Sequence, residues 1–442
     1  MWAYALVVLV LTIGAASGAD VEKISAEEVL GMIQRGEDVE LGGLLIEGDL
    51  DISELDLPRD DDGKIIVGSA IEIHNSEIRG YVCFEGASFQ ERISLYDTKL
   101  SGDTNFRSAN FSGDADFNDV QFGGKADFMS ATFSRYADFD DAQFNGYAFF
   151  DGAEVGGKAD FDDTQFNGDA YFMRAKVSGD ADFEDSQFSG YTDFWDAKFS
   201  GETYFKSATF SGDANFNSVQ FNRDADFSHV RTDDQFYFID ARIDGNLTLT
   251  NARVYTVWLA NITLGKTAKI ELTDSDITRL YAPWPSIKDH LVYNGAAYLA
   301  LVKSYKEQEQ FKDANDCYYQ YRREAQARKG WSDSSKYWDI LACISCGYGV
   351  RPLHTLILSA AVVLICAIYY SFRKVILRLK DTEDNEPDFW DAFYFSMMTF
   401  TTVGYGDWYP KDEHRKVVMA EGIVGWLLLA LFLVTLARIM IP

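Results

Sequence analysis

Phenylalanine recurs through the middle of the chain at gaps of five and six residues. The series runs from Phe106 to Phe227, and Val155 and Val177 replace phenylalanine at two places. The residue two positions before each member is often alanine or another small residue, and the residue directly before it is often aspartate or asparagine. A short fixed period is typical of a solenoid, in which each repeat buries its apolar side chain against the next. An amphipathic helix is the alternative, but this density of glycine and aspartate argues against it.

Alternate repeats carry one extra residue, which usually comes with a glycine at the same phase. The glycines run from Gly113 to Gly212, and Arg135 and Arg223 take the equivalent position in two other repeats. A glycine that recurs at one phase indicates a corner where the backbone needs a positive φ. The pattern therefore predicts left-handed backbone at these glycines.

Two long apolar stretches, residues 353–372 and 417–440, lie near the end of the chain. Each is long enough to cross a hydrocarbon core of roughly 30 Å as a helix. Between them, residues 388–400 form an aromatic segment that is preceded by Pro387 and opens with acidic residues, which are helix-start signals. This segment is too short to span the membrane. We therefore predict a short helix that enters the membrane and returns.

The residues after this segment, 401–407, read Thr-Thr-Val-Gly-Tyr-Gly-Asp. The run resembles the selectivity filter of potassium channels, whose signature is T-V-G-Y-G. In such a filter, backbone carbonyls replace the water around the ion, and glycines allow conformations closed to residues with a Cβ. The resemblance covers residues 353–442 and implies a homotetramer in a lipid bilayer, with K⁺ as the permeant ion. The filter residues that it implies are Thr402, Val403, Gly404, Tyr405 and Gly406.

The same resemblance implies roles for neighbouring residues. Thr401, Asp407 and Tyr394 are expected to support the filter, with a hydrogen bond from Tyr394 on the pore helix to Asp407. In the second span, Gly422 and Gly425 are candidates for a gating hinge. Close helix packing is the alternative, because small residues are favoured where membrane helices meet.

Glu421 is a carboxylate near the filter end of the second span, where a partner or water is within reach. No span is rich in arginine, so the sequence excludes voltage sensing by an S4-type helix. No domain is expected after the second span. Regulation is therefore expected to enter from the N-terminal side.

The phenylalanine series resembles the pentapeptide-repeat family, A-[DN]-[LF]-x-x, as in Phe-Ser-Gly-Asp-Ala-Asp-Phe-Asn-Asp-Val-Gln at residues 111–121. The resemblance implies a right-handed β-helix over residues 44–285, with the central apolar side chain and the preceding small residue pointing inward. Alternate repeats exceed five residues, so the sequence does not decide whether the solenoid has the square cross-section of the family. The overall fold class expected is multidomain: this β-helix, a short α-helical hairpin, and an all-α pore domain with two transmembrane helices and a re-entrant helix.

The remaining segments complete the predicted domain order. Residues 1–19 are apolar and uncharged, and represent either a secretory signal peptide or an N-terminal membrane anchor. Ser25 and Glu28 fit a capping box at the start of a helical cap over residues 20–43. A helical hairpin is expected at 286–335, and its basic tail (Arg322, Arg323, Arg328 and Lys329) suits either anionic lipid or solvent. An interfacial juxtamembrane helix is expected at 336–352.

The net charge of −29 argues against binding nucleic acid through its phosphates. The aspartates of the repeat are interpreted as a solvated surface; an acidic rod that mimics DNA and a calcium-binding face are the alternatives. Five scattered cysteines imply no disulfide framework, and Cys343 and Cys346 form a lone C-x-x-C without the further ligands that zinc needs. No catalytic pattern, cofactor or metal site beyond K⁺ is found, so the chain is not expected to be an enzyme.

Two functions are compatible with these observations. The first is a potassium-selective channel subunit whose β-helical domain is a scaffold or regulatory sensor. The second is a membrane-anchored scaffolding protein, which would not need T-V-G-Y-G. We expect residues 1–19 to remain as an anchor and the solenoid to lie in the cytoplasm. Export after signal cleavage is the alternative, favoured by sequons at Asn246 and Asn261.

Overall fold

The computed structural model describes residues 22–378, 387–404 and 406–440. The segment predicted as a signal or anchor, residues 1–19, lies outside the described residues. Contacts divide the chain into two compact units, residues 1–300 and 301–442, which meet within helix α3 (Gly295–Glu307).

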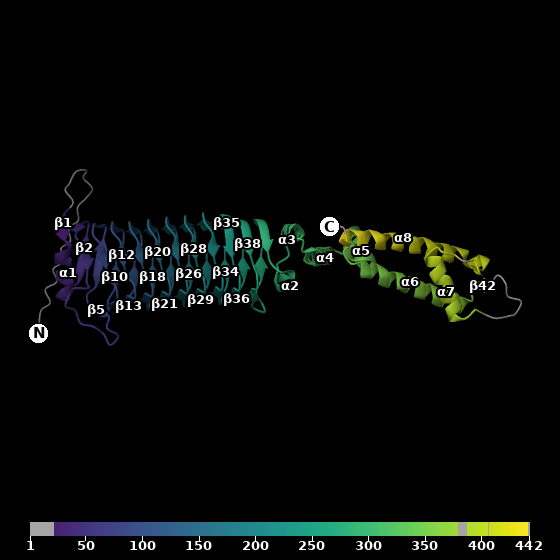
Figure 1. Cartoon of the computed structure of the whole chain (residues 1–442), viewed down its shortest axis with the longest axis horizontal. Coiled ribbons are helices and arrows are strands. Elements are labelled where there is room, and N and C mark those ends of the chain that lie inside the picture. The colour runs from purple at the N-terminus through teal and green to yellow at the C-terminus, as the bar shows by residue number, and fades with distance from the viewer. Residues whose placement is uncertain (1–21, 379–386, 405, 441–442) are drawn as a thin grey trace. The chain divides into compact units, whose positions relative to one another are not determined.

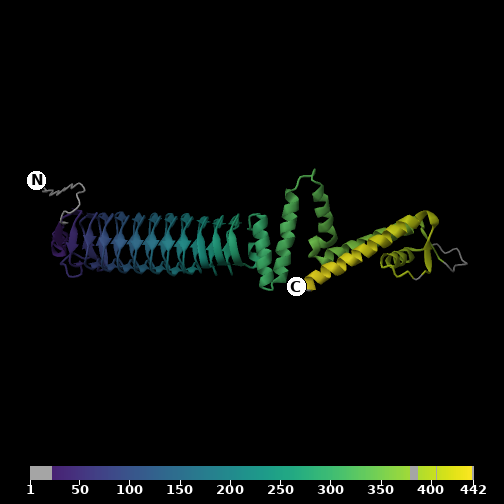
Figure 2. The ribbon, with the colours of Figure 1, turned by 90° about the horizontal axis from the view of Figure 1, so that it is seen from above.

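The repeat region forms a β-solenoid built mostly of two-residue strands (Figure 1). One coil contains β13 (Asn110–Phe111), β14 (Ala115–Asp116), β15 (Gln121–Phe122) and β16 (Ala126–Asp127). The next coil begins at β17 (Thr132–Phe133), which pairs in parallel with β13 at a distance of 22 residues along the chain. Figure 2 shows the coils stacked in this order from a second direction. The β-helix is therefore confirmed, and four strands per coil give it four faces despite the lengthened repeats.

The phenylalanine series fills the centre of the solenoid. Every member from Phe106 to Phe227 is buried. Equivalent rings of successive coils stack nearly parallel: the ring of Phe161 lies 4.9 Å from that of Phe139 and 5.0 Å from that of Phe183. Removing a buried ring of this kind costs about 3–5 kcal/mol. Stacking from coil to coil is therefore a major source of stability for this unit.

The recurring glycines do not adopt the predicted left-handed backbone. None of those from Gly113 to Gly212 at this phase has a positive φ. A Cβ at Gly168 would instead lie 2.5 Å from the carbonyl oxygen of Gly146, one coil earlier, and a Cβ at Gly179 would lie 2.5 Å from that of Gly157. The prediction of positive φ is therefore wrong. Glycine is needed here because neighbouring coils approach too closely for any side chain.

Positive φ occurs instead two residues after alternate members of the phenylalanine series. Asp119, Asp141 and Asp163 have φ between 50° and 58°. Aspartate, asparagine and serine fill most of these corners, since a short polar side chain can hydrogen-bond locally and lowers the cost of this conformation. The corner is therefore marked by a short polar residue and not by glycine.

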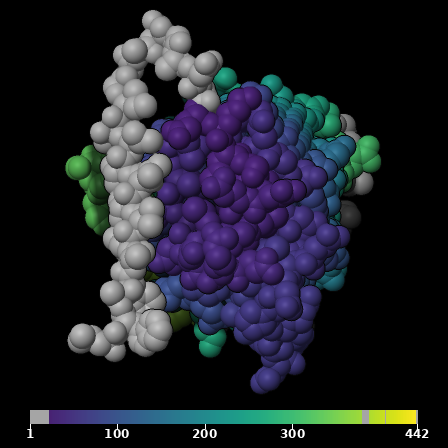
Figure 3. All heavy atoms as spheres, turned by 90° about the vertical axis from the view of Figure 1, so that its left-hand side faces the viewer, coloured from purple at the N-terminus to yellow at the C-terminus, as the bar shows by residue number. Residues whose placement is uncertain are grey.

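Helix α1 (Ala26–Gln34) covers the first coils of the solenoid. The side chain of Ser25 accepts a hydrogen bond of 3.2 Å from the backbone N–H of Glu28, as the capping signal predicts. The buried face of α1 packs on β2 (Val39–Gly42) and β4 (Leu50–Asp51). Figure 3 looks onto this end, where the earliest described residues, in purple, cover the coils behind them.

At the other end, α2 (Trp284–Ile287) buries both of its terminal side chains, so both open ends of the solenoid are closed.

The second unit is mainly helical. Its described residues also include a short antiparallel strand pair, β42 (Ile376–Arg378) with β43 (Trp408–Pro410), which was not predicted. The elements in chain order are α4 (Phe311–Arg328), α5 (Ser334–Cys346), the 3₁₀ turn η1 (Gly347–Gly349), α6 (Pro352–Arg373), β42 (Ile376–Arg378), α7 (Phe389–Phe400), β43 (Trp408–Pro410), the 3₁₀ turn η2 (Asp412–His414) and α8 (Arg415–Met440).

Helices α6 and α8 are long and apolar enough to cross a membrane. Only 22% and 17% of their most apolar windows is buried. Ile357, Phe372 and Val434 are among the large apolar side chains left exposed. The core helix of a soluble protein would be mostly buried, whereas lipid or further protein would cover these surfaces. The exposed apolar surfaces of α6 and α8 are therefore those expected of membrane-spanning helices.

Candidate ion-conduction site

Helix α7 is the short helix between the two spans, and it begins with a reciprocal cap. The side chain of Asp388 accepts a 2.8 Å hydrogen bond from the N–H of Asp391, whose side chain accepts a 3.1 Å bond from the N–H of Asp388. Both carboxylates lie at the positive end of the helix dipole, which stabilises them there. The acidic start signal in the sequence therefore has a physical basis.

Side chains from both spans hold α7. Phe400, its last residue, packs with Val363 of α6 and Leu428 of α8. One turn or more earlier, the ring of Phe395 meets that of Tyr370 edge-on at 5.5 Å. The short helix is thereby fixed between α6 and α8.

The helix ends where the proposed filter sequence begins. The N–H groups of Thr401 and Val403 still donate to the carbonyls of Met397 and Met398, at 3.0 and 3.1 Å. Thr402, between them, has a φ of 59°, which turns the chain away from the helix axis.

Both glycines of the filter sequence adopt left-handed backbone, with φ of 54° at Gly404 and 76° at Gly406. The residues at 402–404, 406 and 407 are exposed in the single chain, and Tyr405 lies outside the described residues. An irregular loop is tolerated at membrane depth only where it lines a pore or is buried in protein. This segment therefore requires surrounding protein.

The predicted supporting residues have different surroundings. Thr401 donates its hydroxyl proton to the carbonyl of Met397 at 2.8 Å, and Thr402 donates to the carbonyl of Thr401 at 2.7 Å. Tyr394 is half-buried on α7, and Asp407 is exposed. The bond from Tyr394 to Asp407 and the place of Thr402 in the filter stay predictions.

The two glycines of α8 differ in how closely they approach α7. A Cβ at Gly425 would lie 2.2 Å from the carbonyl oxygen of Phe400, whereas a Cβ at Gly422 would lie 3.7 Å from that of Thr399. Contact between Gly425 and α7 is therefore closer than any side chain allows. The packing interpretation applies to Gly425, and a hinge at either glycine stays a prediction.

Charged residues in and next to α4 form ion pairs with α5 and with Arg351, the residue before α6. Arg322 and Lys329 bind Asp339 of α5 at 2.8 and 2.6 Å, and Arg351 binds Asp316 of α4 at 2.7 Å. Two of the four cations that we interpreted as facing lipid or solvent therefore hold α4 against α5. On the outer side of α5, Trp338, Leu341 and Ile344 are exposed.

A contact that the sequence did not indicate joins α4 to the last turn of α8. The guanidinium of Arg438 lies over the ring of Tyr318, 5.4 Å from its centroid. The two residues are far apart in sequence and follow no motif. No local pattern could therefore have identified the pair.

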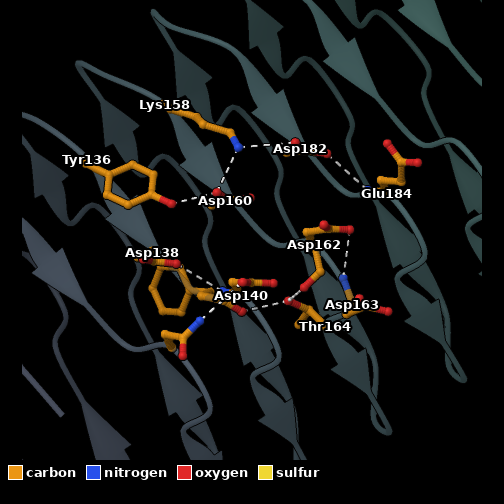
Figure 4. A network of polar contacts seen from close by, with 12 residues as sticks. Tyr136, Asp138, Asp140, Lys158, Asp160, Asp162, Asp163, Thr164, Asp182 and Glu184 are labelled. Carbon is orange, nitrogen blue, oxygen red and sulfur yellow. Dashed lines mark hydrogen bonds and ion pairs between the residues drawn. The ribbon is translucent and has the colours of Figure 1, made fainter. Parts of the chain in front are cut away.

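Carboxylates line one side of the solenoid in columns (Figure 4). Asp138, Asp160 and Asp182 are in register on consecutive coils. Lys158 bridges Asp160 and Asp182 at 2.7 and 3.2 Å, and the hydroxyl of Tyr136 donates to Asp160 at 2.6 Å. In the described part of the chain, no three acidic, histidine or cysteine side chains are grouped so as to hold a metal ion.

The columns shift the titration of their members. Burial, followed by repulsion from Asp116, Asp160 and Asp140, raises the pKa of Asp138 to about 6. Burial, followed by repulsion from Asp182, Asp163 and Asp140, raises the pKa of Asp162 to about 6. Burial, reinforced by like charges stacked coil upon coil, therefore raises the pKa of these carboxyls.

Comparisons with known proteins agree with this geometry. Residues 357–441 match a family model described as "Ion channel". Residues 84–129, 106–154, 150–198 and 194–242 match a model described as "Pentapeptide repeats (9 copies)". Neither a curated protein nor a solved structure matches the chain.

We predict that the solenoid is more stable at pH 5 than at pH 8. Because the folded pKa values of Asp138 and Asp162 lie above those of an unfolded chain, their contribution is present at low pH and is lost as pH rises through about 6. Thermal unfolding of the full chain at both pH values measures the difference. In the Asp138→Asn, Asp162→Asn double variant the difference should shrink, and an unchanged or reversed difference would contradict the prediction.

We predict that Gly425→Ala destabilises the second unit and lowers ion flux, because the new methyl group would force α7 and α8 apart at a cost of about 1–3 kcal/mol. Gly422→Ala is the matched control, since its methyl group has room at 3.7 Å from the carbonyl oxygen of Thr399. Melting temperature in detergent and flux in liposomes are the measurements. Equal effects of the two changes would argue against packing as the role of Gly425.

Proposed function

We propose that this chain, an ion channel subunit with pentapeptide repeats in its N-terminal unit, forms a potassium-selective pore. The observation that carries the proposal is the sequence at 402–406, which follows a short helix held between two apolar spans. Its two described glycines both have the left-handed backbone that an alternating carbonyl ladder needs. Such a ladder supplies the oxygen atoms that replace the hydration shell of K⁺.

The pore is proposed to be a homotetramer, because one chain supplies a single wall of a filter of this type. The exposure of the filter segment and of large apolar side chains on α6 and α8 supports assembly. Neighbouring subunits and lipid would cover these surfaces together. The other proposed participants are K⁺ and the bilayer.

The solenoid is proposed to act as a scaffold or sensor whose movement reaches the pore through α4. Helix α4 contacts α5 through Asp339 and contacts the last turn of α8 through Tyr318 and Arg438. In a pore of this architecture, that end of the second span is where the helices cross and close. A shift of α4 would therefore change the position of the end of α8.

The proposed function predicts that Gly404→Asp abolishes K⁺ flux and leaves assembly intact. A carboxylate on a Cβ would enter the ion path at a backbone φ of 54° that disfavours side chains. Flux into liposomes, with K⁺ and Na⁺ compared, and subunit number in detergent are the measurements. Undiminished selective K⁺ flux in the variant would contradict the assignment of the filter.

We propose that the solenoid lies in the cytoplasm. All five cysteines are free thiols, as is common in a reducing compartment. The side-chain amide of Asn246, in one of the two sequons, donates to Asp224 at 3.1 Å and accepts a hydrogen bond of 3.0 Å from the N–H of Lys269. A glycan on Nδ2 would replace one amide hydrogen and crowd the contact with Asp224, which weakens the case for export. Asn261, in the second sequon, is exposed.

Protease digestion of intact cells tests this orientation. We predict that the solenoid is protected until the membrane is permeabilised, and that the mature chain keeps residues 1–19. Cleavage of the solenoid from outside, or a mature N-terminus near Asp20, would show that the domain is exported.

A further inference from the structure

A buried carboxyl lies in α8 close to its filter end. Glu421 is 3% exposed. Holding a carboxyl at membrane depth is costly unless polar groups satisfy it. The sequence pointed to this residue but could not identify what satisfies it.

Hydroxyl groups from two other helices meet this carboxyl. The hydroxyl of Tyr370 on α6 donates to Glu421 Oε2 at 2.5 Å, and Ser396 Oγ on α7 is hydrogen-bonded to Oε1. Ser396 Oγ also lies 3.0 Å from the carbonyl oxygen of Val363 on α6. Tyr370 and Ser396 are fully buried. One carboxyl therefore joins all three helices of the pore region.

Packing fixes the geometry of this cluster. The ring of Tyr370 is buried with Ile376, Ala392 and Phe395. Among the described residues, no cation forms an ion pair with Glu421. The carboxyl is thus held by two hydroxyl groups and by the thiol of Cys366 on α6, and not by a salt bridge.

The cluster lies directly behind the start of the filter. Ser396 is one turn before Phe400, the last residue of α7, and Thr402 follows two residues later. Glu421 is one turn before Gly425, which touches the carbonyl of Phe400. The same face of α8 therefore contacts α7 at two successive turns.

We propose that Glu421 is a positioning residue, which sets the rotation and depth of α7 through Ser396 and Tyr370 and thereby aligns the filter. Two contact points on one helix fix its rotation, whereas one contact point would leave it free to turn. Loss of the Glu421 contacts would leave only the contacts that Phe400 makes with Gly425 and Leu428, at the end of α7. Ion selectivity depends on carbonyl position, so it should suffer before assembly does. The inference rests on the proposed function.

The hydrogen-bond inventory predicts which substitution is tolerated. Ser396 has one proton and two acceptors within reach, the Val363 carbonyl and Glu421 Oε1. If that proton goes to Val363, position 421 must supply a donor to Ser396 and an acceptor to Tyr370. A glutamine side chain offers both, whereas leucine offers neither.

The test compares Glu421→Gln, Glu421→Leu and Tyr370→Phe in the full chain in liposomes, by the K⁺/Na⁺ permeability ratio and the fraction of assembled oligomer. A tenfold change in the ratio corresponds to about 1.4 kcal/mol, which is within the range for the loss of one buried hydrogen bond. We expect Glu421→Leu to lower the ratio about tenfold or more and Tyr370→Phe to lower it several-fold. Glu421→Gln should stay within about twofold of the unchanged protein. Glu413→Leu, at an exposed carboxylate, is the control.

The possible outcomes distinguish failure of the inference from failure of the proposed function. An unselective unchanged protein would overturn the proposed function and this inference with it. A selective unchanged protein whose assembled Glu421→Leu and Tyr370→Phe variants keep its ratio would overturn the inference alone. A Glu421→Gln variant as impaired as Glu421→Leu would also overturn it, since charge and not hydrogen bonding would then be required. If Glu421→Leu fails to assemble, the permeability ratio of Tyr370→Phe, which loses only one oxygen atom, is the test.

Discussion

Backbone polar groups at membrane depth must be satisfied, and the pore region depends on this constraint. Helices α6, α7 and α8 satisfy their own groups, but the loop after Phe400 cannot. In the proposed pore its carbonyls would face the ion, and further subunits would cover its outer surface. Such a loop would need a firmly held helix before it. The cap at Asp388, the close contact at Gly425 and the buried cluster at Glu421 each limit the movement of α7.

The solenoid meets the same requirement in another way. Each short strand pairs with strands one coil before and one coil after it. Its backbone N–H and C=O groups are therefore hydrogen-bonded to the neighbouring coils. The coils can come this close only where no side chain intervenes, as at Gly146 and Gly168. Aspartates stack in columns along the coils, where several are buried and repel one another. Lys158 offsets part of that repulsion by bridging two coils.

The elements set by local rules could be predicted from the sequence. The length of the apolar stretches predicted both spans, and helix-start signals predicted α1 and α7. The phenylalanine period predicted the β-helix. Contacts between distant residues could not be predicted. The partners of Glu421 come from two other helices, and Asp339 takes two cations that had been interpreted as facing lipid or solvent. Such pairs follow from the packing of helices, which no periodicity encodes.

Glycine was the residue most easily misinterpreted, because one residue type serves two physical needs. In the solenoid we attributed it to positive φ, whereas the structure uses it for close approach and places short polar residues such as Asp141 at positive φ. The filter glycines, Gly404 and Gly406, show the other use, since both are left-handed. Gly425 belongs with the solenoid glycines, because a carbonyl oxygen occupies the space of its Cβ.

A hinge must be free to change its backbone angles, and at Gly425 such a change would first have to break the contact with the end of α7. Movement of α8 about this point would therefore also move α7, which directly precedes the proposed filter.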